Sequence, residues 1–288
     1  MGQIEFKTTD LEPALYIVST PIGNLRDITI RALDVLNSVD IVACEDTRVS
    51  IKLLNAYGIK SKLFSYHEHN AQIAGQKILK DILDGKSVAL ISDAGTPLIS
   101  DPGYNLVNEA KELSIKVIPV PGACAAITAL VGSGFSTNEF YFVGFLPNKQ
   151  KQRLARLEQL SKIEATMVFY ESPNRLVKTL YDMKTIWGDK RKATICRELT
   201  KLYETFYTGC LDELCSKYDN IEHKLGEIVL LVEAVAPEKR VYNEAEIKEI
   251  AVECLKTMSS SKAASYISKL TEQPKNDIYK MLLNINED

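Results

Sequence analysis

Residues 88–103 read Val-Ala-Leu-Ile-Ser-Asp-Ala-Gly-Thr-Pro-Leu-Ile-Ser-Asp-Pro-Gly, an apolar run followed by a segment rich in turn-forming residues. The run predicts a short buried strand, and the clustered Gly, Pro and Asp residues predict turns directly after it. In open α/β sheets, ligands bind just beyond the carboxyl ends of the strands. The loop from Ser92 to Gly103 is therefore the first candidate for a binding loop.

The first half of the chain alternates between short apolar runs and stretches with helical spacing of apolar residues. We expect strands at 15–19, 40–44, 62–66, 88–91 and 116–120, and helices at 28–36, 71–83 and 104–113. This order is typical of an α/β fold with a parallel sheet. A helix of small residues, 123–130, follows the turn at Pro121 and Gly122. Such a helix either packs tightly against a sheet or lets a ligand approach closely.

The residue composition changes around residues 141–148, where a polar, basic stretch begins. A second α/β unit, richer in antiparallel signals, follows, with strands expected at 166–170, 193–196, 204–208 and 227–233 and a helix at 175–186. After a linker from Pro237 to Arg240, three short helices indicate a helix-turn-helix-like module, which either contacts nucleic acid or packs as a cap. We expect an N-terminal extension (1–13), a first α/β domain (14–140), a second α/β domain (141–236) and this C-terminal module (241–288).

The composition is that of an ordinary globular protein. The chain has 288 residues and a formal net charge of −3, so any contact with a nucleic acid needs a local basic face. Its six cysteines form no Cys-x-x-Cys pair and are typical of reduced residues. No stretch approaches the roughly 20 apolar residues of a membrane helix. We expect a soluble, cytoplasmic protein with no membrane partner.

The sequence lacks the motifs of several common classes of enzyme and binding protein. The sequence has no Gly-x-Gly-x-x-Gly after the first strand, no phosphate-binding Gly-x-x-x-x-Gly-Lys-Ser/Thr and no Gly-x-Ser-x-Gly. The one histidine cluster, His67-Glu68-His69, is of a kind that is more often solvated than metal-bound, so we expect no metal. What remains is a set of polar loops at strand ends, contributed by both halves of the chain.

Five of these loop segments, in this order, resemble the tetrapyrrole methylase superfamily of S-adenosylmethionine-dependent enzymes over about residues 14–235. The segments are Thr-Pro-Ile-Gly-Asn-Leu (20–25), Cys-Glu-Asp-Thr-Arg (44–48), the loop 92–103, Gly-Phe-Leu-Pro (144–147) and Tyr-Glu-Ser-Pro-Asn-Arg (170–175). They are most similar to the branch that 2'-O-methylates a decoding-site cytidine of 16S ribosomal RNA. The resemblance implies two α/β domains with the cofactor cleft between them, and a homodimer.

The resemblance also implies which residues contact the cofactor, S-adenosylmethionine. They are Pro21, Ile22, Ser92, Asp93, Thr96, Cys124, Ala125, Glu171, Leu199, Gly226 and Glu227. The sequence departs from the branch at Asn174, where histidine is expected, and this puts a catalytic role for that position in doubt.

Methyl transfer needs an oriented ribose hydroxyl and a base that draws its proton away. Our hypothesis gives the base role to Asp46 or Glu198, with Lys201 as a further catalytic candidate. The candidates for RNA contacts are Arg48, Lys149, Lys151, Arg153, Arg156, Arg175 and Arg197. For each charged residue of the cleft, the alternative is a structural ion pair.

The leading interpretation is thus an enzyme that acts on 16S ribosomal RNA, within the small ribosomal subunit. Three alternatives stay open from the residues. A corrin or porphyrin methylase and a diphthamide-type protein methylase would share the cofactor cleft. A noncatalytic RNA-binding assembly factor would not need to bind the cofactor.

Overall fold

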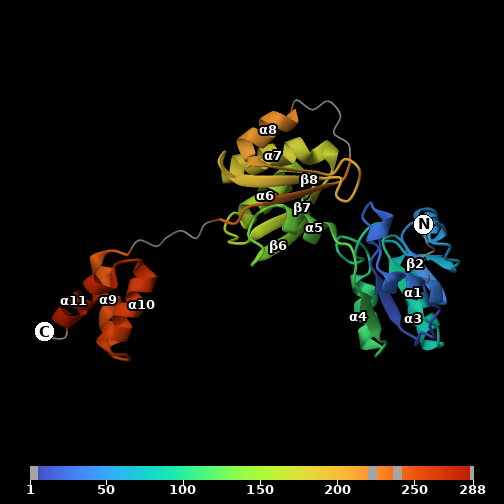
Figure 1. Cartoon of the computed structure of the whole chain (residues 1–288), viewed down its shortest axis with the longest axis horizontal. Coiled ribbons are helices and arrows are strands. Elements are labelled where there is room, and N and C mark those ends of the chain that lie inside the picture. Colours follow the sequence, from blue (N-terminus) through green and yellow to red (C-terminus); the bar gives the residue numbers. More distant parts are fainter. Residues whose placement is uncertain (1–5, 220–225, 236–241, 286–288) are drawn as a thin grey trace. The chain divides into compact units, whose positions relative to one another are not determined.

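The computed structural model describes residues 6–219, 226–235 and 242–285, and it forms two compact units that divide after Val235 (Figure 1). The expected linker, Pro237 to Arg240, lies outside the described residues. So do residues 1–5 of the expected extension, residues 220–225 and 236 of the second expected domain, and residues 241 and 286–288 of the expected module. The first unit contains two five-stranded sheets, and the second consists of helices.

The first sheet is parallel throughout, with the strand order β3-β2-β4-β1-β5. Its strands are β1 (Leu15–Val18), β2 (Ile41–Cys44), β3 (Leu63–Ser65), β4 (Val88–Ile91) and β5 (Val117–Val120). Successive side chains of a strand point to opposite faces. Tyr16 and Val18 therefore pack against α1 (Ile30–Ser38) and α2 (Thr47–Ala56), whereas Leu15 and Ile17 pack against α3 (Ala71–Leu83) and α4 (Tyr104–Glu112). A short 3-10 helix, η1 (Leu25–Asp27), leads into α1.

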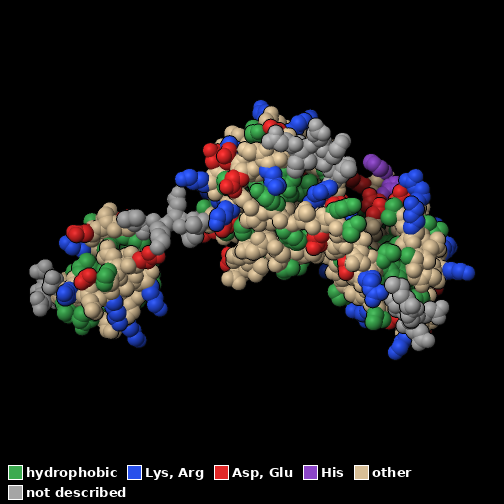
Figure 2. Space-filling model, turned by 45° about the horizontal axis from the view of Figure 1, so that its top comes forward, with side chains coloured by type: hydrophobic (Ala, Val, Ile, Leu, Met, Phe, Trp, Pro, Cys, Tyr) green, Lys and Arg blue, Asp and Glu red, His purple; other side chains and the backbone are tan. Residues whose placement is uncertain are grey.

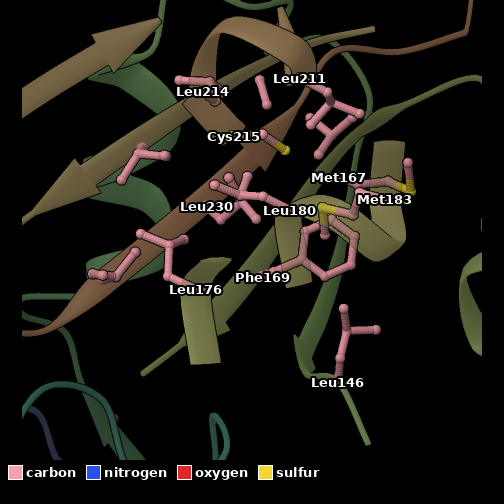
Figure 3. Close-up of a cluster of buried hydrophobic side chains, with 14 of the residues drawn as sticks. Leu146, Met167, Phe169, Leu176, Leu180, Met183, Leu211, Leu214, Cys215 and Leu230 are labelled. Carbon is pink, nitrogen blue, oxygen red and sulfur yellow. The ribbon is translucent and has the colours of Figure 1, made fainter. Parts of the chain in front are cut away.

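The second sheet is mixed, with the order β6-β7-β10-β8-β9, in which only the β6–β7 pair is parallel among the described strands. Its strands are β6 (Phe140–Phe145), β7 (Thr166–Glu171), β8 (Lys192–Arg197), β9 (Thr205–Cys210) and β10 (Ile228–Val232). One face is covered by α6 (Gln150–Leu160), α7 (Pro173–Trp187) and α8 (Leu211–Asp219). In Figure 3, Phe169 and Leu230 of the strands pack with Leu176 and Leu180 of α7 and Leu214 of α8.

The other face of the second sheet is covered by α5 (Ala125–Gly132). Ala126 and Ala129 are buried against a layer that includes Val168 and Val229. The expected boundary at residue 141 assigns α5 to the first domain, yet the helix packs on the sheet of the second. Its small side chains allow this close approach, which is the tight-packing alternative raised for this segment.

The second unit is a bundle of α9 (Glu244–Leu255), α10 (Ser260–Thr271) and α11 (Lys275–Ile285) around one apolar core. Asn243 and Glu246 form a capping box at the start of α9. Glu272, in the left-handed conformation with φ 56°, ends α10, and α11 begins three positions later. These are the three short helices expected from the sequence. None of the helices in the described part of the chain is long and apolar enough to span a membrane.

Candidate active site

The loops after β1 and β4 meet where the order of the parallel sheet reverses. β1 and β4 are neighbours, but the chain leaves β1 toward α1 on one face and leaves β4 toward α4 on the other. Such a switch point forms a crevice at the carboxyl ends of the strands. The backbones of the two loops are joined there, because Thr20 N donates to Gly95 O at 2.8 Å and Gly95 N donates to Thr20 O at 3.2 Å.

The loop 92–103 has an unusual backbone conformation. Leu98 and Ser100 have φ values of 72° and 67°, a left-handed region that costs a non-glycine residue energy. Side-chain hydrogen bonds hold the start of the loop: Ser92 Oγ donates to Gly95 O at 3.2 Å, and Thr96 Oγ1 donates to Ala123 O at 3.0 Å. Strain of this kind gathers at functional sites.

A second strained loop, after β8, contacts the loop after β1. Glu198 and Thr200 also have positive φ values, 53° and 65°. The backbone N–H of Asn24, from the loop after β1, donates to Thr200 Oγ1 at 3.1 Å. Lys201 Nζ lies 3.0 Å from Glu198 Oε1 and 3.2 Å from Glu227 Oε2. Loops from both α/β halves thus meet at one place.

These loops enclose a cavity of about 390 Å³, a size typical of small-molecule sites. It is lined by Ile22, Asp93, Ala94, Gly95, Thr96, Ile99, Ser100, Asp101, Ala125, Phe145, Tyr170, Glu171, Ser172, Pro173, Leu199, Gly226, Glu227, Ile228 and Val229. Four of the lining residues are carboxylates, and none of the described lining residues is Lys or Arg. The cavity therefore suits a cationic ligand with apolar parts and does not suit a phosphate.

The carboxylates near the cavity differ in their charge states. Burial raises the pKa of Asp101 to about 6, and partial burial also raises the pKa of Asp93. Hydrogen bonds from Arg48 lower the pKa of Asp46 to about 2. The Glu227 N–H and the Lys201 ammonium lower the pKa of Glu198. Figure 2 shows acidic side chains gathered beside the histidine side chains of the first α/β half.

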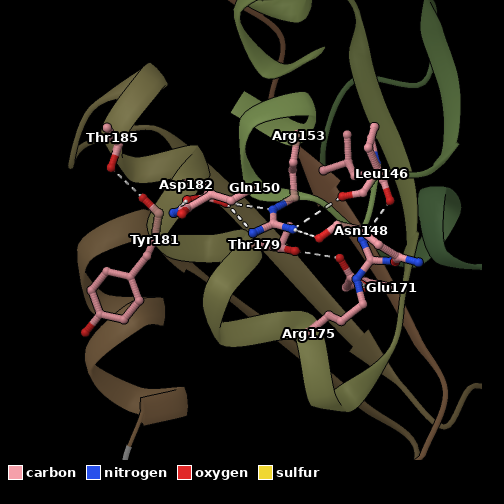
Figure 4. Close-up of polar contacts among 11 residues, drawn as sticks. Leu146, Asn148, Gln150, Arg153, Glu171, Arg175, Thr179, Tyr181, Asp182 and Thr185 are labelled. Carbon is pink, nitrogen blue, oxygen red and sulfur yellow. Dashed lines mark hydrogen bonds and ion pairs between the residues drawn. The ribbon is translucent and has the colours of Figure 1, made fainter. Parts of the chain in front are cut away.

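Glu171, at the end of β7, is 4% exposed, and both of its carboxylate oxygens have partners (Figure 4). Its Oε2 accepts from Thr179 Oγ1 at 2.6 Å, its Oε1 accepts from Ser172 N at 2.7 Å, and Arg175 Nε lies 3.3 Å from Oε1. This carboxylate is held in a fixed position at the cavity wall.

The structure brings most of the expected cofactor residues to the cavity. Eight of the eleven line it: Ile22, Asp93, Thr96, Ala125, Glu171, Leu199, Gly226 and Glu227. The other three lie beside them without lining it: Pro21 is buried next to Ile22, Ser92 hydrogen-bonds to Gly95, and Cys124 caps α5. Their contact with a ligand stays a prediction.

The expected catalytic residues lie outside the cavity lining. Asp46 forms an ion pair with Arg48, at 2.7 Å between Oδ2 and Nη2, and also caps α2. Glu198 pairs with Lys201, which also pairs with Glu227. These are the structural ion pairs that the sequence left open as the alternative, and the lowered pKa values make Asp46 and Glu198 weak bases.

Some of the residues expected to contact RNA are exposed, and others form bonds inside the protein. Arg153 is a correction: it is 4% exposed, and its guanidinium lies 2.6 Å from Asp182 Oδ2, so it has no surface for a phosphate. Arg175 also turns inward, donating to Leu146 O at 2.7 Å. Lys149, Lys151 and Arg48 are exposed, and Arg156 and Arg197 are partly exposed.

The expected site residues leave out several residues of the cavity wall, among them Asp101, Phe145 and Tyr170. Asp101 lies near the end of the turn-rich segment, and Phe145 and Tyr170 belong to two of the loop motifs. A carboxylate among turn residues was the signal for Asp101. Its partial burial depends on residues far away in the sequence.

The part of the chain that the structure describes includes no cluster of His, Cys, Asp or Glu that could hold a metal ion.

Comparisons with known proteins agree with this geometry. The family described as Tetrapyrrole (Corrin/Porphyrin) Methylases matches residues 14–215. A solved structure of uroporphyrin-III C-methyl transferase from Thermus thermophilus, complexed with S-adenyl homocysteine, has the same fold, with a TM-score of 0.54 at 16% identity over 76% of this chain and 96% of that one. A diphthine synthase structure gives a TM-score of 0.60 at 12% identity, over 84% and 94% of the two chains.

Two curated relatives are much more similar in sequence and match along nearly their whole length. Ribosomal RNA small subunit methyltransferase I of Mesorhizobium japonicum is 49% identical, covering 100% of this chain and 97% of the relative. The protein of the same name from Vibrio cholerae is 45% identical, covering 96% of each. The chain therefore belongs to the tetrapyrrole methylase family and, within it, to the ribosomal RNA small subunit methyltransferase I family.

Proposed function

We propose that this chain transfers a methyl group from S-adenosylmethionine to the ribose 2'-oxygen of a decoding-site cytidine in 16S ribosomal RNA. It is a methyltransferase that uses S-adenosylmethionine and acts on ribosomal RNA, in keeping with the names of its relatives. The cytidine, the 2'-oxygen and the assembled small subunit are the finer parts of the proposal. They rest on the resemblance of the loop motifs.

The charge of the cavity is the observation that carries the proposal. Asp93, Asp101, Glu171 and Glu227 line it, without a lysine or arginine among the described lining residues. Glu171 pairs with Arg175 and Glu227 pairs with Lys201, whereas Asp93 and Asp101 have no ion pair among the described residues. S-Adenosylmethionine has a sulfonium, an ammonium and no phosphate, so its charge complements this wall. Gly95 and Gly226 let the backbone come close, since a Cβ on Gly95 would lie 3.1 Å from Ile22 and one on Gly226 would lie 2.5 Å from Glu198.

Several residues would hold the cofactor. Ile22, Leu199 and Val229 supply apolar wall, while Asp93 and Glu227 supply negative charge. When bound, S-adenosylmethionine supplies a methyl group on a positively charged sulfur. This chain's own part is to hold the acceptor hydroxyl in line with that methyl group and to exclude water.

We expect Asp93→Asn to weaken binding of S-adenosylmethionine about tenfold, because the amide keeps the shape but loses the attraction between opposite charges. S-Adenosylhomocysteine, which lacks the charge on sulfur, should lose less affinity. Titration calorimetry with both ligands measures the difference, and Glu112→Gln on the exposed surface of α4 is the control. Unchanged affinity for S-adenosylmethionine would remove Asp93 from the binding site.

The RNA surface in our proposal includes Lys149 and Lys151, at the start of α6. Both are exposed. Lysine side chains are among the groups that contact phosphates of nucleic acids. Arg48, Arg156 and Arg197 stay in the proposal as partly or fully exposed cations. Arg153 and Arg175 do not belong to this surface because they are engaged inside the protein.

We expect Lys149→Glu/Lys151→Glu to weaken RNA binding. The slope of the logarithm of the binding constant against the logarithm of the salt concentration should become shallower by about one to two, because fewer phosphate contacts form and fewer counterions are released. Filter binding at several salt concentrations measures this slope. Lys60→Glu/Lys62→Glu has the same charge change at the amino end of β3, opposite the cavity edge of the sheet. Equal slopes for the two variants would place the RNA site elsewhere.

The C-terminal module is a second candidate for phosphate contacts. Lys262, Tyr266 and Lys269 recur at a spacing that places them on one face of α10, and all three are exposed. α10 contains no Asp or Glu, whereas α9 contains Glu244, Glu246, Glu249 and Glu253. The acidic residues are thus gathered on α9 and the basic face on α10.

The proposal includes a homodimer and a cytoplasmic location. Exposed apolar side chains support the dimer: Val131 of α5 is 70% exposed and Leu202, before β9, is 88% exposed. Phe206 of β9 is also partly exposed and lies against Gly132 of α5, where a Cβ would come within 2.5 Å of its ring. Apolar patches of this kind mark contact surfaces.

A further inference from the structure

Lys201 lies in the loop after β8, at the place where loops of the two α/β halves meet. Its ammonium nitrogen is 3.0 Å from Glu198 Oε1 and 3.2 Å from Glu227 Oε2, and its side chain is 29% exposed. Glu227 lines the cavity, whereas Lys201 and Glu198 do not. Lys201 therefore contacts one residue of the cavity wall from outside the cavity.

The aliphatic part of Lys201 packs against the loop after β1, which belongs to the first half. A Cβ added to Gly23 would lie 2.5 Å from Lys201 Cγ and 2.9 Å from its Cε, so glycine leaves the room that this side chain occupies. The next residue, Asn24, donates its backbone N–H to Thr200 Oγ1 at 3.1 Å. One hydrogen bond and one close packing contact thus connect the two loops.

The loop after β8 has a strained backbone that its neighbours hold in place. Glu198 and Thr200 have φ values of 53° and 65°, which non-glycine residues keep only where the surrounding structure fixes them. Glu198 N donates to Glu227 O at 2.9 Å, and Glu227 N donates to Glu198 Oε1 at 2.9 Å. The loop is therefore attached to the cavity wall at Glu227 as well as to the first half.

The residues that line the cavity are direct neighbours of the residues that connect the two loops. Ile22 precedes Gly23, and Leu199 precedes Thr200 and Lys201. Ile22 and Leu199 are each 6% exposed, belong to one buried apolar cluster and line the cavity. A change in the contact between Lys201 and Gly23 therefore moves both of these wall residues.

We propose that Lys201 is a positioning residue for S-adenosylmethionine. By bridging the loops after β1 and β8, it keeps Ile22, Leu199 and Glu227 in the arrangement that fits the cofactor; we call this contact the Lys201 bridge. This inference rests on the proposed function, in which the cavity holds the cofactor. A bridge of this kind orders both loops in advance, whereas without it the ligand has to order them at a cost in affinity.

Lys201→Ala should weaken binding of S-adenosylmethionine and of S-adenosylhomocysteine equally, each at least about tenfold, because a displaced wall affects every ligand of this shape. A residue that acted through its charge alone would behave differently. Its removal would leave Glu227 without its cation and would favour the positively charged S-adenosylmethionine over S-adenosylhomocysteine. Titration calorimetry with both ligands separates the two cases, and Lys201→Arg, with a long aliphatic chain and a positive charge, should recover most of the affinity.

Lys184→Ala is the matched control. Lys184 of α7 also lies between two carboxylates, with Asp212 Oδ1 at 2.5 Å and Asp189 Oδ1 at 3.5 Å, and its side chain is 27% exposed. It is not among the residues that line the cavity or connect the loops. The control should bind both ligands as the wild type does. Affinities of Lys201→Ala that equal those of Lys184→Ala would overturn the positioning role.

A double-mutant cycle with Gly23 tests the contact itself. Gly23→Ala should weaken cofactor binding at least about tenfold, because the new Cβ displaces the Lys201 side chain. In the Lys201→Ala background, Cγ and Cε are absent, so the same substitution should have an effect at least about fivefold smaller. Backbone strain at Gly23 is common to both backgrounds and cancels. Additive effects of the two substitutions would contradict the Lys201 bridge.

Kinetics separate positioning from chemistry. With small ribosomal subunits that lack the modification, Lys201→Ala should raise KM for S-adenosylmethionine at least about tenfold and change kcat much less. Dissociation of S-adenosylhomocysteine should become faster by a similar factor. A large loss of kcat with unchanged cofactor affinity would overturn the proposal and assign Lys201 to the reaction itself. Failure of the wild type to bind S-adenosylmethionine would instead contradict the proposed function, on which the bridge depends.

Discussion

Asp182→Ala is expected to lower the free energy of unfolding by about 3–5 kcal/mol, the cost of leaving a buried charge unpaired. The side chains of Arg153 and Asp182 are 5% and 6% exposed, and their closest atoms lie 2.6 Å apart. Gln150 Nε2 also donates to Asp182 Oδ1 at 3.0 Å, and Arg153 Nη1 donates to Asn148 O at 3.0 Å (Figure 4). Without Asp182, the guanidinium of Arg153 stays buried and loses its carboxylate partner.

Urea unfolding followed by circular dichroism measures the loss. Asp212→Ala removes a partner of Lys184 in an exposed pair, 27% and 54% exposed, and should cost at most about 1 kcal/mol. The double variant Arg153→Met/Asp182→Leu replaces both charges by apolar groups and should be more stable than Asp182→Ala. A loss under about 1 kcal/mol for Asp182→Ala would show that Arg153 finds water or another partner, and would return it to the RNA candidates.

Gly226→Ala is expected to weaken binding of S-adenosylmethionine at least about tenfold. Gly226 has φ 99°, and a Cβ there would lie 2.5–2.6 Å from Cγ, Cδ and Oε1 of Glu198. Glu198 would have to move, together with its bonds to Lys201 Nζ and Glu227 N. Since Gly226 and Glu227 line the cavity, the displacement changes the shape of its wall.

Gly188→Ala is the matched control, because Gly188 has φ 84° and a Cβ added there would have no neighbouring atom within 4 Å. Both substitutions should cost about 1–2 kcal/mol of stability through the left-handed backbone, and only Gly226→Ala should add the clash. Calorimetry and thermal melts separate the two effects. Equal cofactor affinities for the two variants would mean that the Gly226 turn does not shape the binding site.

The strands and the amphipathic helices could be predicted from the sequence because apolar periodicity reports burial directly. The helix expected at 71–83 is α3, and the strand expected at 88–91 is β4. Three helices have no such clear signal. The sequence of α2 resembles a charged turn, that of α6 resembles a basic stretch between domains, and α8 is absent from the expected elements. In α6 the apolar face is narrow, and one of its buried residues is an arginine.

Most of the cavity wall could also be anticipated, because motif loops at strand ends bring their residues to one edge. The roles of charged residues could not. Asp46 and Asp101 are both aspartates in motif loops. Arg48 lies two positions from Asp46, whereas Asp101 is partly buried at a cavity that it lines together with Phe145 of β6 and Tyr170 of β7. A partner close in the sequence, such as Arg48 for Asp46, can be suspected from spacing alone. Burial such as that of Asp101 arises from the packing of distant segments and leaves no local signal. The inward turn of Arg153 has the same origin, since Asp182 lies 29 positions away.

Methyl transfer from radiolabelled S-adenosylmethionine to small ribosomal subunits from cells without the enzyme, followed by nucleoside analysis, tests the central claim most directly. The account predicts label in 2'-O-methylcytidine of 16S ribosomal RNA. Cofactor binding without label in RNA would contradict it and direct the search to tetrapyrrole or protein acceptors. Absence of cofactor binding would leave a noncatalytic RNA-binding role.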